Sequence, residues 1–363
     1  MHNNQLAKRL ATYSAVSTEL ALLSNERLLG LLENAIPLGA GIGGTTALLE
    51  IAGSTVFVKR VRGLTDIERR PEHIMSTANL FELPTFCQYG LSGIGSPGFG
   101  VWRELATHVM TTNWVITGEC PNFPLMYHWR LLPRPLPGLP TQEQLDEVER
   151  DVAYWEGSPA VHARLLANLE TSAEIVLFLE HFPENLDQWL RKQFAKGDDA
   201  IESACAMVES NLHPIVSFIN SRGLLHFDAH FWNILTDGHE LYFADFGLAL
   251  CERFELSKAE RDFFKTHHNY DRCYIMAHWA KWLVSELFGA DKYEAILHEY
   301  AAGKESKTLP PTVALIILRY APIAVAMNEF FRKIMTGSKR EPYPVNELEG
   351  LRINIAAKNP ISI

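Results

Sequence analysis

The sequence has little cysteine and arranges it without a motif. Its 363 residues include only five cysteines, an odd number with no C-x-x-C pair among them. They are Cys87, Cys120, Cys205, Cys251 and Cys273. A scattered, odd set is typical of reduced thiols and argues against a disulfide framework or a zinc ribbon. We therefore predict free thiols and a cytoplasmic location.

Long apolar runs are also missing. The chain has no stretch of about 18 apolar residues, which is the length that a membrane span needs. Residues 1–20 lack the continuous apolar core and the cleavage site of a signal peptide. We expect neither a membrane span nor a membrane partner.

The chain also lacks an excess of positive charge. Lysine and arginine total 33 against 43 aspartates and glutamates, which gives a net charge of −10. Nucleic-acid backbones are bound mainly by lysine and arginine, so we expect no nucleic-acid partner. An acidic chain is compatible with a cationic small molecule. With 47% hydrophobic residues, the composition is that of a globular protein long enough for two packed units.

The order of predicted elements indicates the α+β class. Residues 5–35 have the periodicity of one or two helices, and two short strands follow at 47–51 and 55–59. Further on, we expect helices at 66–80, 101–115, 141–169 (broken near 157) and 200–222, and a buried strand at 174–179. Two short strand–loop units, 224–236 and 241–250, precede a mostly helical region from 257 to 335 and a polar tail. This order suits a protein of two lobes better than alternating βαβ units.

The two strand–loop units carry the residues with the clearest chemistry. Asp228 and Asn233 lie five positions apart on the first loop, and Asp245 opens an Asp-Phe-Gly run on the second. Phosphoryl transfer uses one carboxylate to accept the proton of the attacking hydroxyl. It also uses carboxylate and amide oxygens to hold Mg²⁺, which prefers such hard ligands.

These residues resemble the catalytic core of the protein-kinase-like superfamily. His226, Asp228, His230 and Asn233 fit H-x-D-x-H-x-x-N, which is similar to the aminoglycoside phosphotransferase and choline kinase branch. Protein kinases usually carry Arg and Lys where this chain has Phe227 and His230, and no A-P-E follows the D-F-G here. The D-F-G-L-A run itself looks more like a protein kinase. On balance the resemblance implies a small-molecule hydroxyl acceptor.

The resemblance also implies a fold and a division into domains. We expect a two-lobed protein-kinase-like fold with a small β-rich N-lobe, a helical C-lobe and an insertion before the hinge. ATP would lie between the lobes, with Asp228 as catalytic base and Asn233 and Asp245 holding Mg²⁺. The expected boundaries are an N-terminal helical segment at 1–35, an N-lobe at 36–180 with an insertion at about 91–170, a C-lobe at 181–336 and a polar tail at 337–363.

An upstream nucleotide clamp fits the same resemblance. Gly39, Gly41 and Gly44 form G-x-G-x-x-G, a pattern that Rossmann domains share. In a Rossmann domain a helix follows the glycines, whereas here two predicted strands follow and end near Lys59. Glycine lets backbone N–H groups approach phosphates, and Lys59 would neutralise their charge. We expect these residues to bind ATP.

Two further nucleotide contacts follow from the resemblance. The partner of Lys59 should be a glutamate on the next helix, where Glu68 and Glu72 are the candidates, and we favour Glu72. The hinge is expected at Glu180 to Phe182, whose backbone groups would bind the adenine edge.

Several alternatives stay open at this point. The acceptor could be an aminoglycoside or other antibiotic, or a metabolite, and the donor could be GTP. A Ser/Thr protein kinase and a nucleotide-binding pseudokinase acting as an interaction module are the rival functions. His226 and His230 could bind zinc, although a buried scaffold role suits His226 better, and His230 could orient Asp228 or fill space. The role of 91–170 and the oligomeric state are not indicated by the sequence.

Overall fold

The computed structural model describes residues 2–41, 43–61, 63–91, 95–135, 138–304 and 309–358. The chain forms two compact units. The first comprises Met1–Phe182, Ala244–Ala249 and Phe254–Ser257, and the second comprises Pro183–Phe243, Leu250–Arg253 and Lys258–Ile363. The first division between them falls between Phe182 and Pro183. The N-terminal segment belongs to the first unit and the C-terminal tail to the second.

The first unit combines a five-stranded sheet with helices. Its elements in chain order are α1 (His2–Leu22), α2 (Asn25–Glu33), β1 (Ile36–Gly41), β2 (Gly44–Ile51), β3 (Ser54–Val61), the 3₁₀ turns η1 (Pro71–His73) and η2 (Thr85–Gln88), α3 (Val101–Ile116), β4 (Met126–Pro133), α4 (Gln142–Tyr154), α5 (Pro159–Leu169) and β5 (Ala173–Glu180). The predicted helices at 5–35, 101–115 and 141–169 are confirmed.

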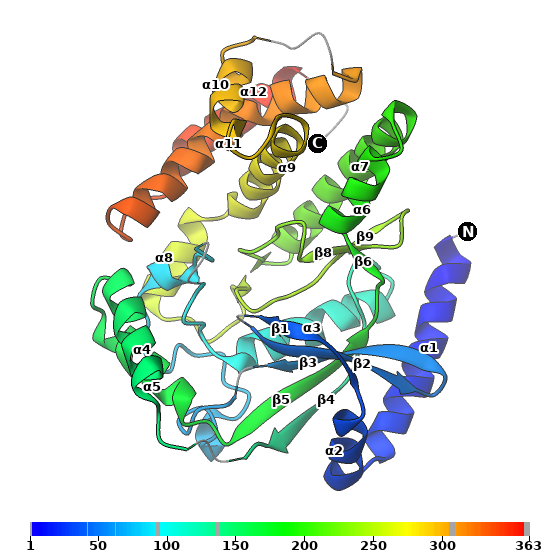
Figure 1. Cartoon of the computed structure of the whole chain (residues 1–363), viewed down its shortest axis with the longest axis vertical. Coiled ribbons are helices and arrows are strands. Elements are labelled where there is room, and N and C mark those ends of the chain that lie inside the picture. Colours follow the sequence, from blue (N-terminus) through cyan, green and yellow to red (C-terminus); the bar gives the residue numbers. More distant parts are fainter. Residues whose placement is uncertain are drawn as a thin grey trace. The chain divides into compact units, whose positions relative to one another are not determined.

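The sheet is antiparallel with strand order β1-β2-β3-β5-β4 (Figure 1). The turn at Ala52 and Gly53 joins β2 to β3, as the sequence predicted. Val56 and Val58 of β3 are buried, whereas β5 is buried along almost its whole length, as expected for a strand in the sheet interior. This central pair of strands places Lys59 opposite Leu177 of β5.

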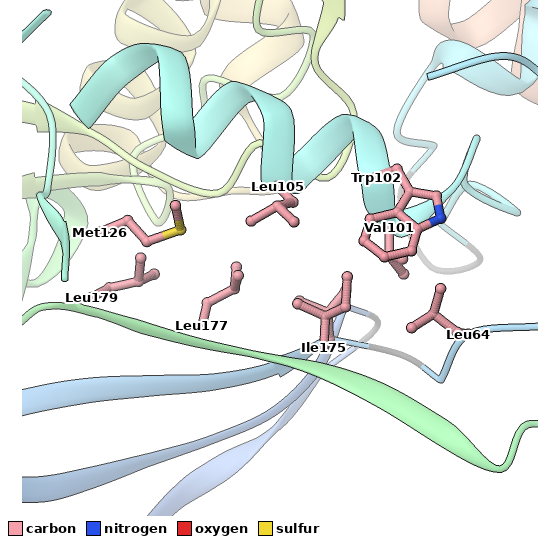
Figure 2. Packing of buried hydrophobic residues seen from close by; sticks show 9 residues of the cluster. Leu64, Val101, Trp102, Leu105, Met126, Ile175, Leu177 and Leu179 are labelled. Atoms are coloured by element: carbon pink, nitrogen blue, oxygen red, sulfur yellow. The ribbon is translucent and has the colours of Figure 1, made fainter. Parts of the chain in front are cut away.

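Helix α3 packs against the sheet through an apolar cluster. Figure 2 shows Leu105 and Trp102 of α3 lying over Ile175, Leu177 and Leu179 of β5. Burying one such large apolar side chain is worth roughly 1.5–3 kcal/mol. The cluster therefore fixes α3 over the sheet.

One expectation for this unit is wrong. Residues 66–80 do not form a helix but a series of turns with the short η1. Pro71 explains this, because proline lacks a backbone N–H and favours an extended conformation in the residue before it, here Arg70 with ψ 141°. Residues 91–170, where the insertion was expected, hold α3, β4, α4 and α5.

Gly44 is needed for the pairing of β2 with β3. Its φ is +136°, and a Cβ there would lie 2.0 Å from the carbonyl oxygen of Arg60. No side chain fits at that distance from backbone. The pairing of the strands therefore requires glycine at position 44, the third glycine of the motif. A Cβ at Gly39 or Gly41 would meet nothing within 4 Å.

The second unit is mainly helical. Its elements are β6 (Glu184–Asn185), α6 (Leu186–Phe194), α7 (Asp198–Ser221), β7 (Leu224–Leu225), β8 (Ile234–Thr236), β9 (Leu241–Phe243), β10 (Leu250–Cys251), α8 (Lys258–Thr266), α9 (Tyr270–Phe288), α10 (Tyr293–Ala301), α11 (Pro311–Thr336) and α12 (Val345–Lys358). The short strands form a β6-β8-β9 sheet and a β10-β7 pair. The chain is therefore a mixed α+β protein, as predicted.

Helix α11 is the core helix of this unit. It packs against α9 and α10 (Figure 1). Among the described residues it is the one helix with the length and composition of a membrane span, with a mean hydropathy of 1.5, but 56% of that apolar window is buried inside the protein. Burial against neighbouring helices accounts for its apolar sequence without a membrane.

The C-terminal tail and the cysteines complete the fold. Part of the expected polar tail is the helix α12, which is tied to the rest of the unit because Asn269 donates a hydrogen bond to Glu349 at 3.2 Å. All five cysteines are buried free thiols, which agrees with the prediction of reduced cysteine.

Candidate active site

Lys59 is the centre of a buried ionic cluster in the first unit. Its Nζ lies 2.8 Å from a carboxylate oxygen of Glu104 and 2.9 Å from Oδ1 of Asp245. Lys59 and Glu104 are both buried, whereas the Asp245 side chain is 42% exposed. The lysine and aspartate predicted from separate motifs are thus in direct contact.

Opposing effects act on the charges of this cluster. Burial lowers the pKa of Lys59, but the nearby Asp245 and Glu104 carboxylates outweigh burial and raise it above its usual value. Burial raises the pKa of Glu104, and Lys59 offsets part of that shift. Lys59 therefore stays protonated at any physiological pH.

The partner of Lys59 is Glu104, so the expectation of Glu72 is wrong. Glu72 lies in η1 and not on a helix. The alternative candidate, Glu68, is buried in an ion pair with Arg164. A signal for Glu104 was present: it shares a helical face with Val101 and His108, three and four residues away, and a lone acid on an apolar face needs a buried partner.

Phe246, the residue after Asp245, packs against α3. Phe246 is fully buried, and its ring stacks edge-to-face on that of His108 at 5.0 Å. Asp245 has a φ of +60°, a left-handed conformation that few residues other than glycine adopt. Its Oδ1 also accepts a hydrogen bond from the Gly247 amide at 3.3 Å. Such strain is typical of functional positions.

The glycine-rich turn lies beside the same lysine. A Cβ at Gly43 would be 3.5 Å from Nζ of Lys59. Gly43 was not among the expected nucleotide contacts, whereas Gly39 and Gly41 lie on β1. Backbone at this turn can thus approach any group that Lys59 binds.

Glu180 has a structural role that the sequence did not reveal. Its carboxylate accepts two hydrogen bonds from Arg9 of α1, both 2.8 Å long. Its backbone N–H donates to the carbonyl of Leu125 at 2.8 Å. The predicted adenine contacts at Glu180 and Phe182 stay predictions, with the N–H of Glu180 already engaged.

Asp228 and Asn233 lie together in the second unit. The side-chain amide of Asn233 donates to the carbonyl oxygen of Asp228 at 2.9 Å and to its Oδ2 at 3.1 Å. These two bonds orient the amide and leave its oxygen for another partner. Ile234 pairs with Phe243, so Asn233 lies at the end of the β8–β9 hairpin where β9 finishes.

A buried carboxylate anchors the loop that carries Asp228. Asp271, at the start of α9, accepts hydrogen bonds from the backbone N–H groups of His226 at 2.7 Å and Phe227 at 3.0 Å. Phe227 has a φ of +62°. Nδ1 of His226 in turn accepts the N–H of Asp228 at 3.3 Å. His226 is therefore a buried scaffold residue, as expected.

The other residues of this loop separate into buried and exposed groups. Nε2 of His230 lies 3.6 Å from Oδ1 of Asp228, close enough to orient it. Phe231 is fully buried, whereas Trp232 is 59% exposed. Packing thus accounts for Phe231 but not for Trp232.

Zinc lacks support in the part of the chain that the structure describes, where no group of three or more His, Cys, Asp or Glu is placed to hold a metal ion. Magnesium has different requirements, since it usually takes one or two protein ligands and completes its shell with water and phosphate oxygens. The amide oxygen of Asn233 and the half-exposed carboxylate of Asp245 are donors of this kind. These residues fit Mg²⁺.

Three histidines of the second unit, the buried His267 and the half-buried His213 and His278, make it sensitive to acid. Burial lowers the pKa of His213 and His267 to about 4 and that of His278 to about 3. His278 also accepts the N–H of Phe231 on Nε2, a bond that protonation would break. Below pH 6.5 these histidines bind protons in the unfolded chain but not in the folded chain. Their contribution to the free energy of unfolding therefore decreases as the pH is lowered.

We expect the contribution of these three histidines to this free energy to be about 4 kcal/mol lower at pH 5.5 than at pH 7.5, or roughly 1.3 kcal/mol per histidine. Urea unfolding of the parent and of His213→Gln at both pH values, followed by tryptophan fluorescence, measures the share of one histidine. His213→Gln should make the change in stability between the two pH values smaller by about 1.3 kcal/mol. A change equal to that of the parent contradicts the expectation.

No family model matches this sequence, and no curated protein matches it. Its function therefore has to be inferred from the chemistry of the residues described above.

Proposed function

We propose that this protein is an ATP- and Mg²⁺-dependent phosphotransferase with a two-lobed protein-kinase-like fold, which phosphorylates a hydroxyl group of a small molecule. The observation that supports the proposal most directly is the contact of Lys59 with both Glu104 and Asp245. A strand lysine paired with a glutamate of a helix packed on the same sheet, together with the D-F-G aspartate, is the arrangement that kinase-type phosphoryl transfer uses.

Each group has a defined role in the proposed reaction. Lys59 neutralises charge on the phosphates, and Glu104 holds Lys59 in place. Asn233 and Asp245 would hold Mg²⁺, which would supply positive charge against the phosphates. Asp228 accepts the proton of the acceptor hydroxyl as the hydroxyl oxygen bonds to the γ-phosphorus, and the bond to the β–γ bridging oxygen breaks to release ADP.

A small-molecule acceptor is favoured by what surrounds Asp228. Phe227 is buried and tied to Asp271, and His230 lies 3.6 Å from the carboxylate of Asp228. Neither side chain supplies the Arg or Lys that protein kinases carry in these positions. We propose a hydroxylated small molecule as acceptor, such as an aminoglycoside-like antibiotic or a metabolite.

The proposal is tested by ATP consumption with and without Mg²⁺ across a panel of aminoglycosides, peptide antibiotics, amino alcohols and casein. We expect Mg²⁺-dependent consumption of ATP with at least one small molecule. Phosphorylation of casein alone would move the assignment to a protein kinase. Tight ATP binding without turnover on any acceptor would overturn the assignment as an enzyme.

A further inference from the structure

A second buried ion pair lies in the first unit, apart from Lys59. Arg164 of α5 contacts the carboxylate of Glu68 at 2.9 Å, and their side chains are only 5% and 2% exposed. Glu68 belongs to the turns after β3. Removing two charges from water is costly, so such a pair is kept where geometry and additional hydrogen bonds compensate for it.

Each member of the pair also contacts a different segment of the chain. Oε2 of Glu68 accepts the backbone N–H of Thr65 at 3.0 Å and its hydroxyl at 2.6 Å. The Arg164 guanidinium lies over the ring of Phe81 at 5.0 Å, and its Nε donates to the carbonyl of Pro97 at 3.5 Å. The pair thus joins α5 to the turn at Thr65 and to the segments that contain Phe81 and Pro97.

The same glutamate contacts the beginning of α3. The indole Nε1 of Trp102 donates to the backbone carbonyl of Glu68 at 3.1 Å. Gly100, the N-cap of α3, comes so close that a Cβ there would lie 3.0 Å from Oε1 of Glu68. Figure 2 shows Trp102 above Leu64, at one end of the cluster. Glu104 follows two residues later, about 3 Å further along the helix axis.

We infer that the Glu68–Arg164 pair is a clamp that positions α3, and through it sets Glu104 against Lys59. The clamp gives α5 and the segments around Glu68, Phe81 and Pro97 a shared role, which is to hold the first turn of α3. Its effect on phosphotransfer rests on the proposed function, whereas its effect on α3 does not. Glu68 and Arg164 are positioning residues, because they act through Glu104.

A double-mutant cycle separates positioning from general stabilisation. Glu68→Gln keeps the shape of the side chain and the backbone carbonyl, but it removes the charge that Arg164 contacts. We expect it to weaken Mg²⁺–ATP binding about tenfold, a loss typical of coupled neighbours. In a Glu104→Gln background the same substitution should cause no further loss. Equal losses in both backgrounds, or no loss in the parent, would overturn the inference.

The matched control is Asp66→Asn, which removes an exposed acid that pairs with Arg69 on the surface of the same segment. It should leave ATP binding unchanged. The variant Glu68→Gln/Arg164→Met extends the test, since it removes both charges and leaves neither one buried alone.

Hydrogen–deuterium exchange tests the clamp without nucleotide. Amides of 101–108 should exchange faster in Glu68→Gln than in the parent chain, with β4 unchanged. Exchange that is equal in α3, or faster throughout the first unit, would contradict the inference. If the parent chain binds no Mg²⁺–ATP, the proposed function is refuted but the clamp is not. The exchange result would still decide whether the clamp exists.

Discussion

Asp228→Asn is expected to lower the rate of phosphotransfer by about 10²–10⁴-fold, the usual contribution of a general base. Asparagine has the same size and keeps an oxygen that can accept the amide of Asn233, which bonds to Asp228 in the parent. The fold and the affinity for Mg²⁺–ATP should therefore change little. The loss should appear in kcat and not in the KM for ATP, because only the proton acceptor is removed.

Single-turnover kinetics with the best acceptor of the panel and calorimetric titration of Mg²⁺–ATP measure the two quantities. The matched control is Asp199→Asn, which changes an exposed acid at the start of α7 and should leave both unchanged. Turnover that survives in Asp228→Asn would show that another group accepts the proton.

Asp271→Ala should destabilise the second unit strongly. It removes the acceptor of the backbone N–H groups of His226 and Phe227 and one acceptor of the side-chain amide of Asn220, which keeps its bond to the Leu224 carbonyl. Two buried backbone donors then lose this acceptor, at roughly 1–3 kcal/mol each. We expect a loss of at least about 3–5 kcal/mol, as for other broken buried charge interactions.

Thermal unfolding of the second unit measures this loss. We expect its melting temperature to fall by about 2–4 °C for each kcal/mol of stability lost. Asp262→Asn serves as control, because Asp262 pairs with Lys258 on the surface and such pairs contribute little. A drop in Asp271→Ala no larger than in this control would show that the loop holds its own conformation without the carboxylate.

The regular elements were predictable because their patterns are local. Alternation indicated β2 and β3, and the spacing of Asp228, Asn233 and Asp245 indicated two loops beside short strands. The contact between Lys59 and Asp245 could be inferred only through a resemblance, since 186 positions separate the two residues in sequence.

The errors arose where tertiary contacts decide. Glu72 lay near Lys59 in sequence, but Pro71 interrupts the helix that it needed. The helix containing Glu104 was itself predicted, yet nothing local shows that it packs over β5. The anchoring role of Asp271 likewise depends on a loop 44 residues upstream, at Phe227.

The buried thiols provide separate reporters for the two units. Cys87 and Cys120 belong to the first unit, and Cys205, Cys251 and Cys273 to the second. Burial raises the pKa of the Cys87 and Cys205 thiols to about 12, so alkylating reagents, which attack the thiolate, can modify them only when the surrounding structure opens. Alkylation rates at individual cysteines, resolved by mass spectrometry, therefore measure whether the two halves of the chain unfold together or one before the other.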